Sequence, residues 1–229
     1  MTGGARPLAV VCVSGGMDSC VTAALAALSH RLAFLHADYG QRTEDRERAA
    51  FHRLADHFRA EHRLVADFPA LGSIGGSSLT DLSIPVGEGE PEAGQVPTSY
   101  VPFRNAHLLA AATSWGEVLG AEAVFVGAVE EDSSGYPDCR LEFYRAFQRV
   151  VELGTRPETR IRIVTPVIAM SKADIVREGR KLHVPFEMTW SCYQSEDLAC
   201  GVCESCRLRL RGFARAGVAD PLPYRAPGA

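Results

Sequence analysis

The stretch "CVSGGMDSC", residues 12–20, follows a short apolar run, "LAVV", at residues 8–11. A short apolar run bounded by turn residues is typical of a buried strand, and the helical spacing of apolar residues from Val21 to Leu28 predicts a helix next. The glycines between them permit a tight turn with positive φ. Backbone N–H groups then point into a concavity at the helix N-terminus, which favours an anion. The stretch therefore predicts a strand–turn–helix unit that holds phosphate.

The same residues allow a second interpretation, in which Asp18 and Ser19 merely cap the helix, as short polar side chains often do. The patterns GxxxxGK[ST] and GxGxxG are both absent, so neither of those motifs decides between the two interpretations. Where the first pattern has a lysine, this turn offers hydroxyls and a carboxylate from Ser14, Asp18 and Ser19.

Strand-like and helix-like segments alternate along most of the chain. We expect strands at 8–13, 32–35, 62–66, 123–126 and 161–164, with helices at 44–58, 105–119 and 141–153. This alternation predicts an α/β fold with a parallel, doubly wound sheet and helices on both faces. Ligands of such sheets bind at the carboxyl ends of the strands, so "HADYGQR" at 36–42 should face the same crevice as the glycine turn.

Composition excludes several functional classes. The 229 residues are 46% hydrophobic and carry a formal net charge of −4, so a broad cationic surface for nucleic acid is not indicated. No apolar stretch is long enough to span a bilayer, and the run from Leu8 to Val13 is too short for a signal-peptide core. We therefore expect a cytoplasmic protein with no membrane partner and no stable nucleic-acid partner.

Residues 68–102 interrupt the alternation. The segment is rich in Gly, Ser and Pro, and no Lys, Arg or His lies between Arg63 and Arg104. A loop of this length in a compact domain is often a lid or a binding loop. A solvated acidic insertion explains the composition as well, and both interpretations stay open.

The C-terminal quarter carries a cysteine cluster, "SCYQSEDLACGVCESC". Four thiolates can surround Zn²⁺ tetrahedrally, which predicts a closed structural site; its ligands are Cys192, Cys200, Cys203 and Cys206. Zinc would then pin residues 186–229 onto an α/β domain formed by residues 1–185. An iron–sulfur cluster, or burial without metal, are the alternatives. Cys12 and Cys20 are expected in the core.

The full string "SGGMDS" after the first strand resembles the SGGxDS signature of the PP-loop ATP pyrophosphatases. In that family the motif holds the phosphates of ATP, which is split to AMP and pyrophosphate. The resemblance implies a Rossmann-like, adenine nucleotide alpha hydrolase-like fold. It also implies a set of ATP-binding residues: Val13, Ser14, Gly15, Gly16, Met17, Asp18, Ser19, Asp38, Gln41 and Arg42.

Further motifs narrow the resemblance. They are "DYGQR", "VPFRN" at 101–105, "SGYPDCR" at 134–140, "SKADI" at 171–175 and "TWSCY" before the cysteines. Together they resemble the 7-cyano-7-deazaguanine (preQ0) synthases of queuosine biosynthesis, over about Leu8 to Pro221. Phe103 departs from this pattern, because the family often has glycine or alanine there.

The resemblance implies a ligase that uses ATP twice. ATP would adenylate the carboxylate of 7-carboxy-7-deazaguanine, and ammonia would displace AMP to give an amide. A second ATP would activate the amide oxygen, and elimination would give the nitrile. Free ammonia or a partner would supply the nitrogen, and the family implies a homodimer.

Several residues suit this chemistry. Arg104 and Lys172 are the cations that would stabilise phosphate charge, and Mg²⁺ would bridge phosphate oxygens. Ser14, Asp18 and Ser19 complete the predicted catalytic set. Surface charge is the alternative for both cations. Acidic and aromatic side chains would hold the deazaguanine, although each can instead belong to a polar turn; the substrate-binding candidates are Arg104, Asn105, Glu130, Asp132, Tyr136 and Asp138. His36 is a possible base, although a lone His at a strand end is more often structural, and no general base is assigned.

Two competing functions stay open on the sequence. A related enzyme would stop at the amide or transfer the activated deazaguanine to a macromolecule. A zinc-bearing, non-catalytic RNA-binding module would use the arginines beside the cysteines, which are Arg207, Arg209, Arg211 and Arg215.

Overall fold

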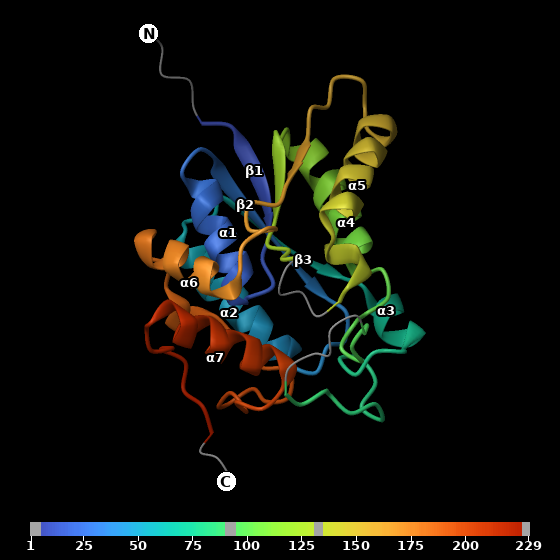
Figure 1. Cartoon of the computed structure of the whole chain (residues 1–229). Coiled ribbons are helices and arrows are strands. Elements are labelled where there is room, and N and C mark those ends of the chain that lie inside the picture. Colours follow the sequence, from blue (N-terminus) through green and yellow to red (C-terminus); the bar gives the residue numbers. More distant parts are fainter. Residues whose placement is uncertain (1–5, 90–94, 131–134, 226–229) are drawn as a thin grey trace.

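The computed structural model describes residues 6–89, 95–130 and 135–225 (Figure 1). Its strands are β1 (Leu8–Cys12), β2 (Arg31–Asp38), β3 (His62–Asp67), β4 (Ala123–Val126) and β5 (Arg162–Val164). They form one parallel sheet in the order β3-β2-β1-β4-β5, which confirms the predicted doubly wound fold.

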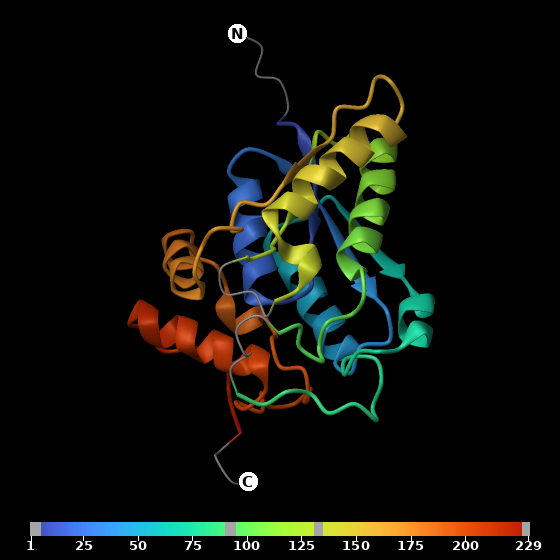
Figure 2. The same ribbon diagram turned by 45° about the vertical axis from the view of Figure 1, so that its right-hand side comes forward.

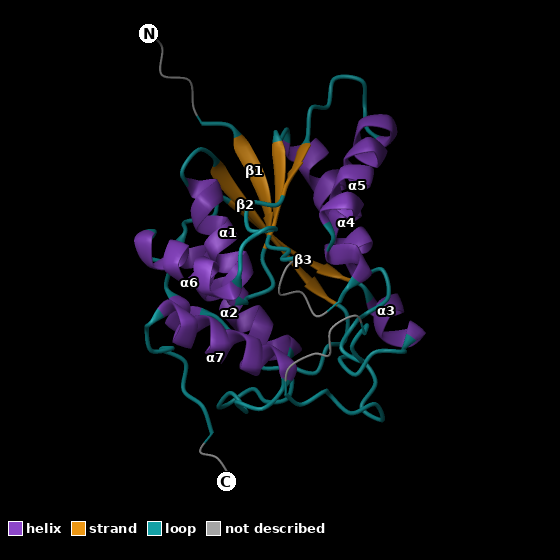
Figure 3. Cartoon of the chain, viewed as in Figure 1, coloured by secondary structure: helices purple, strands orange, loops and turns teal. Residues whose placement is uncertain are grey.

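Seven α-helices surround the sheet in the described part of the chain (Figure 3). They are α1 (Met17–Ala27), α2 (Glu44–His57), α3 (Pro69–Ile74), α4 (Arg104–Leu119), α5 (Leu141–Gly154), α6 (Lys172–Lys181) and α7 (Glu204–Ala216). Two short 3₁₀ helices complete the set, η1 (Pro137–Cys139) and η2 (Phe186–Met188). No helix in this part of the chain combines the length and apolar character that a bilayer crossing needs.

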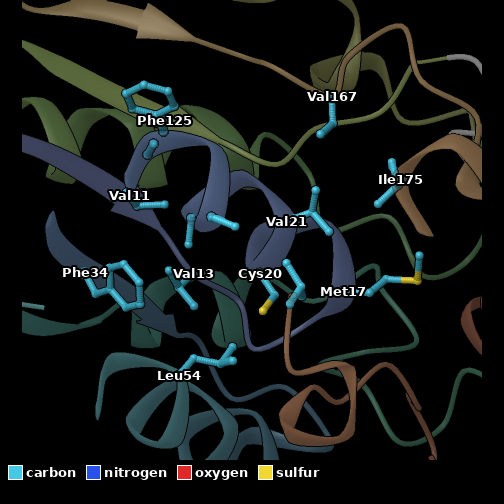
Figure 4. Packing of buried hydrophobic residues seen from close by; sticks show 14 of the residues in the cluster. Val11, Val13, Met17, Cys20, Val21, Phe34, Leu54, Phe125, Val167 and Ile175 are labelled. Carbon is cyan, nitrogen blue, oxygen red and sulfur yellow. The ribbon is translucent and has the colours of Figure 1, made fainter. Parts of the chain in front are cut away.

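Strand β1 is buried on both faces, and its side chains alternate between two cores. Ala9 and Val11, with Val13 just beyond the strand, join the cluster under α1 and α2 (Figure 4). Leu8 and Val10 point the other way, into the cluster under α4 and α5. The period of two along a strand thus places one group of helices on each face of the sheet, as Figure 2 shows.

The strand order reverses between β1 and β4, and this switch point is where the glycine turn lies. Gly127, just after β4, approaches the first turn of α1 so closely that a Cβ there would lie 2.8 Å from the Ser19 nitrogen. The ends of β1 and β4 and the start of α1 therefore meet at one point of the sheet edge.

The described residues of the segment 68–102, which are 68–89 and 95–102, contain α3 and a series of turns, some of which contact the segment that carries the four cysteines. Glu88 forms an isolated antiparallel bridge with Cys203, and the Gly89 amide donates to the Val202 carbonyl at 3.0 Å. The described part of this segment is therefore a wall that contacts the C-terminal segment. Whether it also closes as a lid stays a prediction.

The C-terminal residues pack on the α/β core rather than beside it. Helix α7 crosses α6 so closely that a Cβ at Gly212 would lie 2.8 Å from the Lys172 Cβ. Arg209 of α7 is 1% exposed and forms a bidentate ion pair with Asp220 at 2.7 and 2.9 Å. The division into residues 1–185 and 186–229 stays a prediction.

Candidate active site

The glycine turn after β1 has the conformation that its sequence requires. Gly15 has φ +87°, and a Cβ there would lie 2.8 Å from the Glu47 carbonyl oxygen of α2. Gly16 is the N-cap of α1, without a side-chain cap, so the interpretation of Asp18 and Ser19 as the cap is wrong. Ser19 lies inside the first turn and its Oγ donates to the Gly16 carbonyl at 3.0 Å.

Asp18 and Lys172 join this turn to α6. The Lys172 Nζ donates to Asp18 Oδ2 at 2.6 Å, with side chains 13% and 26% exposed. The second oxygen, Asp18 Oδ1, is buried and has no hydrogen-bond partner among the residues described. Carboxylate oxygens are ligands that Mg²⁺ prefers, so Asp18 Oδ1 fits a divalent cation beside bound phosphates.

A cavity of about 250 Å³ opens in front of the turn. The carboxyl ends of β1, β2 and β4 form its floor, as expected for ligand sites of doubly wound sheets. The lining includes all five residues that the sequence predicted to be catalytic, which are Ser14, Asp18, Ser19, Arg104 and Lys172.

Arg104, at the start of α4, lies among phenol groups. Its Nη1 donates to the Tyr39 hydroxyl at 3.0 Å, and the guanidinium is 5.6 Å from the Tyr39 ring centre. Tyr136 and Tyr193 line the same cavity and interact electrostatically with Arg104. Phe103, the residue before the helix, has φ +59°, which explains why glycine suits this position.

Four sulfur atoms gather beside the cavity, those of Cys192, Cys200, Cys203 and Cys206, all within 4.8 Å of one another. Tetrahedral Zn–S bonds of roughly 2.3 Å require sulfurs about 3.8 Å apart, so the group fits Zn²⁺. Backbone amides support it, since Cys200 N and Gln194 N each lie 3.4 Å from the Cys192 sulfur. The predicted ligand set is thus confirmed as a cluster; the identity of the metal stays a prediction.

Comparisons with known proteins identify the family of this chain. The family model described as "Queuosine biosynthesis protein QueC" matches residues 8–217. The chain belongs to the QueC family. It is 57% identical over 218 residues to the 7-cyano-7-deazaguanine synthase of Chloroherpeton thalassium, covering 95% of this chain and 96% of that protein. It is 58% identical over 220 residues to the synthase of Chlorobaculum tepidum, covering 94% and 96%. Among solved structures, the NMN synthetase of Francisella tularensis is a distant likeness, with TM-score 0.47 and 15% identity over 98% and 90% of the two chains.

Four predicted ATP-binding residues of this QueC chain do not line the cavity, which are Gly15, Asp38, Gln41 and Arg42. Asp38 pairs with Arg48 at 3.0 Å, and Gln41 donates to the Ala37 carbonyl at 3.3 Å. Arg42 donates to carbonyl oxygens of the wall segment, those of Ser78, Asp81 and Ile84. Their contacts are structural, and nucleotide binding by them stays a prediction.

The predicted deazaguanine contacts divide similarly. Asn105 and Tyr136 line the cavity, but Asp138 and Glu130 do not. Asp138 Oδ2 accepts the Asn105 amide at 2.9 Å, so the carboxylate holds the start of α4, and burial raises its pKa. Glu130 Oε2 accepts the Leu141 amide at the start of α5, at 3.1 Å. Asp132 lies outside the described residues.

Two titratable groups near the turn are held in place. His36 Nδ1 lies 2.8 Å from the Val13 carbonyl, and Nε2 lies 3.1 Å from Asp38 Oδ1. Burial opposes charge on His36, but the contacts with Asp38 and Val13 outweigh it and raise its pKa. Both ring nitrogens face acceptors, so His36 is a structural residue rather than a free base.

Cys139 lines the cavity as a neutral thiol, because burial raises its pKa to about 11.

The sequence interpretation missed several lining residues, which are Tyr39, Glu47, Trp190, Ser191, Tyr193 and Glu204. Tyr39, Trp190 and Tyr193 lie inside the quoted motifs "DYGQR" and "TWSCY", so a signal existed for them. Glu47 lies in the charged helix "EDRERAA", which looks like a solvent-exposed face. Only the packing of α2 against the glycine turn reveals it.

Proposed function

We propose that this protein converts 7-carboxy-7-deazaguanine and ammonia to 7-cyano-7-deazaguanine, with two ATP consumed per product. The strongest support is the identity of 57–58% over nearly the full chain to proteins named 7-cyano-7-deazaguanine synthase. The site is consistent with it, since one cavity contains the SGGMDS turn, Lys172 and Arg104. An RNA-binding module is not supported, because Arg209 is buried in its ion pair with Asp220.

The glycine turn and the two cations would handle the phosphates. In the first activation, a substrate carboxylate oxygen attacks the α-phosphorus of ATP, and pyrophosphate leaves. Backbone N–H groups at the start of α1, with Lys172 and Arg104, stabilise the charge that develops. Mg²⁺ supplies further neutralisation of phosphate charge when bound, and Asp18 Oδ1 is the acceptor that would hold it.

The remaining steps repeat this activation on the amide. Ammonia adds to the acyl carbon, AMP leaves, and one proton is lost, which gives the amide. The amide oxygen then attacks the α-phosphorus of a second ATP, and pyrophosphate leaves. Loss of AMP and of both N–H protons forms the nitrile. The same turn and cations serve both activations, because each develops charge on the same phosphate.

The cysteine cluster would hold Zn²⁺ in a structural role. Four thiolates leave no open position for a substrate, and the sulfurs belong to the segment that closes the cavity. We further propose that the protein is cytoplasmic, works as a homodimer, needs Mg²⁺ and binds no nucleic acid stably.

A mass-resolved turnover assay tests the proposal. Purified zinc-loaded protein is mixed with Mg-ATP, ammonium and 7-carboxy-7-deazaguanine, and the base and nucleotide products are weighed. We expect the nitrile with two AMP per turnover. Accumulation of the amide with one AMP would instead support an enzyme that stops halfway. Absence of AMP from folded protein would contradict both.

A further inference from the structure

Carboxylates line the cavity at three positions of the described chain, Asp18, Glu47 and Glu204. Asp18 is paired with Lys172 at 2.6 Å. Glu204 Oε2 accepts a hydrogen bond from the Ser99 hydroxyl at 2.8 Å. Glu204 directly follows Cys203, one of the four clustered cysteines. Two of the three carboxylates therefore already have a role in the phosphate site or in the wall.

Glu47 has no comparable partner. Its Oε1 accepts the Thr43 hydroxyl at 2.8 Å, and its Oε2 faces the Gln41 amide at 3.5 Å. Both partners are neutral, and no ion pair of Glu47 is formed within the described residues. A carboxylate that is partly withdrawn from water and hydrogen-bonded only to neutral groups keeps unused acceptor capacity. Burial accordingly raises the Glu47 pKa.

The surroundings of Glu47 indicate what it can bind. Its charge interacts with the Arg104 guanidinium and with the Tyr39 phenol, and all three residues line the same cavity. One cavity is therefore lined by a carboxylate, a guanidinium and a phenol ring, so hydrogen-bond acceptors and donors are both available to a ligand there. The edge of a guanine-like base is complementary, because N1–H and the 2-amino group donate and the neighbouring carbonyl oxygen accepts.

We propose that Glu47 recognises the deazaguanine by accepting its N1–H and 2-amino hydrogens, and so determines which base enters the site. This inference rests on the proposed function. It assigns to α2 the recognition that the sequence predicted for Glu130, Asp132 and Asp138. Glu130 and Asp138 hold the starts of α5 and α4, and neither lines the cavity.

The physical consequence is discrimination against bases without the 2-amino group. A site built around a buried acceptor rejects a ligand that lacks the matching donor, because the acceptor then stays unpaired. A hydrogen bond to a charged group changes affinity by roughly tenfold to a hundredfold. We therefore expect wild-type protein to bind the 2-deamino analogue of 7-carboxy-7-deazaguanine about ten to a hundred times more weakly than the substrate.

A cycle of two ligands and matched variants tests this. Dissociation constants for the substrate and its 2-deamino analogue are measured by calorimetry, with a non-hydrolysable α,β-methylene ATP present. Glu47→Gln should lose most of the preference for the 2-amino group, with unchanged nucleotide affinity and zinc content. Glu47→Asp keeps the carboxylate and should retain part of the preference. Glu44→Gln, one turn earlier on α2 and outside this cavity, should behave as wild type.

The outcomes separate this inference from the proposed function. Full retention of the preference in Glu47→Gln would overturn the inference, while wild-type nitrile formation would leave the proposed function intact. A lower kcat with unchanged dissociation constants for both ligands would also overturn it, since Glu47 would then act on the reaction and not on recognition. Failure of wild-type protein to bind or convert the acid would instead refute the proposed function.

Discussion

The ion pair of Asp18 and Lys172 joins residues that are 154 positions apart in the sequence. Its place between the first turn of α1 and the start of α6 puts a cation next to the glycine turn. Under the proposed function, Lys172 would thereby supply the positive charge that other phosphate loops carry within the loop itself. At the residue scale, we expect the site to depend on this pair and on the partly buried carboxylate of Glu47.

Lys172→Met tests the role of the cation. The variant should lower kcat by about a hundredfold to a thousandfold, because preorganised charge stabilisation of a transition state contributes on that order. Steady-state AMP release measures it. Lys181→Met on the same helix is the control, since Lys181 is exposed, pairs with Glu178 and does not line the cavity. A kcat that is equal in the two variants would contradict the assignment.

The raised pKa of Glu47 has a consequence for stability. A carboxyl group with a folded-state pKa above its unfolded value of 4.5 stabilises the fold below pH 4.5, and this contribution is lost as pH rises through the folded-state pKa. Glu47→Gln carries no such charge. The ligand-free variant should therefore gain unfolding free energy relative to wild type as pH rises from 4.5 to the folded-state pKa, and the difference should be constant above it.

Urea unfolding of both proteins across pH 4 to 8 measures this difference. The difference in unfolding free energy, variant minus wild type, should be larger near neutral pH than at pH 4. A difference that does not depend on pH would show that the Glu47 carboxyl group titrates as it does in the unfolded chain.

At the scale of elements, hydrogen bonds link the start of α7, which follows Cys203, to the cavity. Tyr136 donates to the Ser99 hydroxyl at 2.9 Å, and Ser99 donates to Glu204 at 2.8 Å. Ser99 is fully buried, and it belongs to the wall segment that precedes α4. The start of α7 thus fixes the position of a ring that lines the cavity, through a single hydroxyl.

Ser99→Ala interrupts this link. Removal of one partner of a buried hydrogen bond leaves another group unpaired and costs about 1–3 kcal/mol. We expect KM for the deazaguanine to rise about fivefold or more, with KM for ATP and the zinc content unchanged. Ser83→Ala, in an exposed turn of the same segment, should leave both KM values as in wild type. Equal KM values in the two variants would show that Tyr136 is held without Ser99.

Metal removal should loosen the same wall. Without a cation the four thiolates repel one another, and the contacts of Cys203 with Glu88 and of Gly89 with Val202 lose their anchor. Hydrogen exchange after chelation should accelerate at residues 86–89 and 95–101, while β1 amides stay protected. Exchange that accelerates uniformly would indicate global unfolding, and unchanged exchange would show that the wall does not need the metal.

At the scale of the whole molecule, several features with a local signal were predicted from the sequence, although the helix α6, capped by Ser171, was missed. The strand–turn–helix unit at residues 8–27 follows from apolar periodicity and glycine. The four cysteines follow from ligand spacing. The positions of α4 and α5 were predicted to within one residue at each end, because their apolar faces repeat at helical spacing.

The sequence was insufficient wherever tertiary contacts determine which way a side chain points. Arg42 and Gln41 follow a strand end, as ligand residues do, yet the wall segment and β2 engage them. Glu47 lies in a helix rich in charge, and only the approach of α2 to Gly15 turns it toward the cavity. Polarity at the edge of a sheet indicates that a site is near. It does not indicate which of these polar side chains will form hydrogen bonds with neighbouring elements instead of facing the site.

The cavity is lined by residues from Cys12 to Arg209, so both early and late parts of the chain complete it. During synthesis, the sheet core and the glycine turn leave the ribosome long before Trp190 to Arg209 do. A nascent chain can therefore hold the first elements of a nucleotide site while one wall is still missing. The order of translation thus leaves the lining of the cavity incomplete until the segment from Trp190 to Arg209 has emerged.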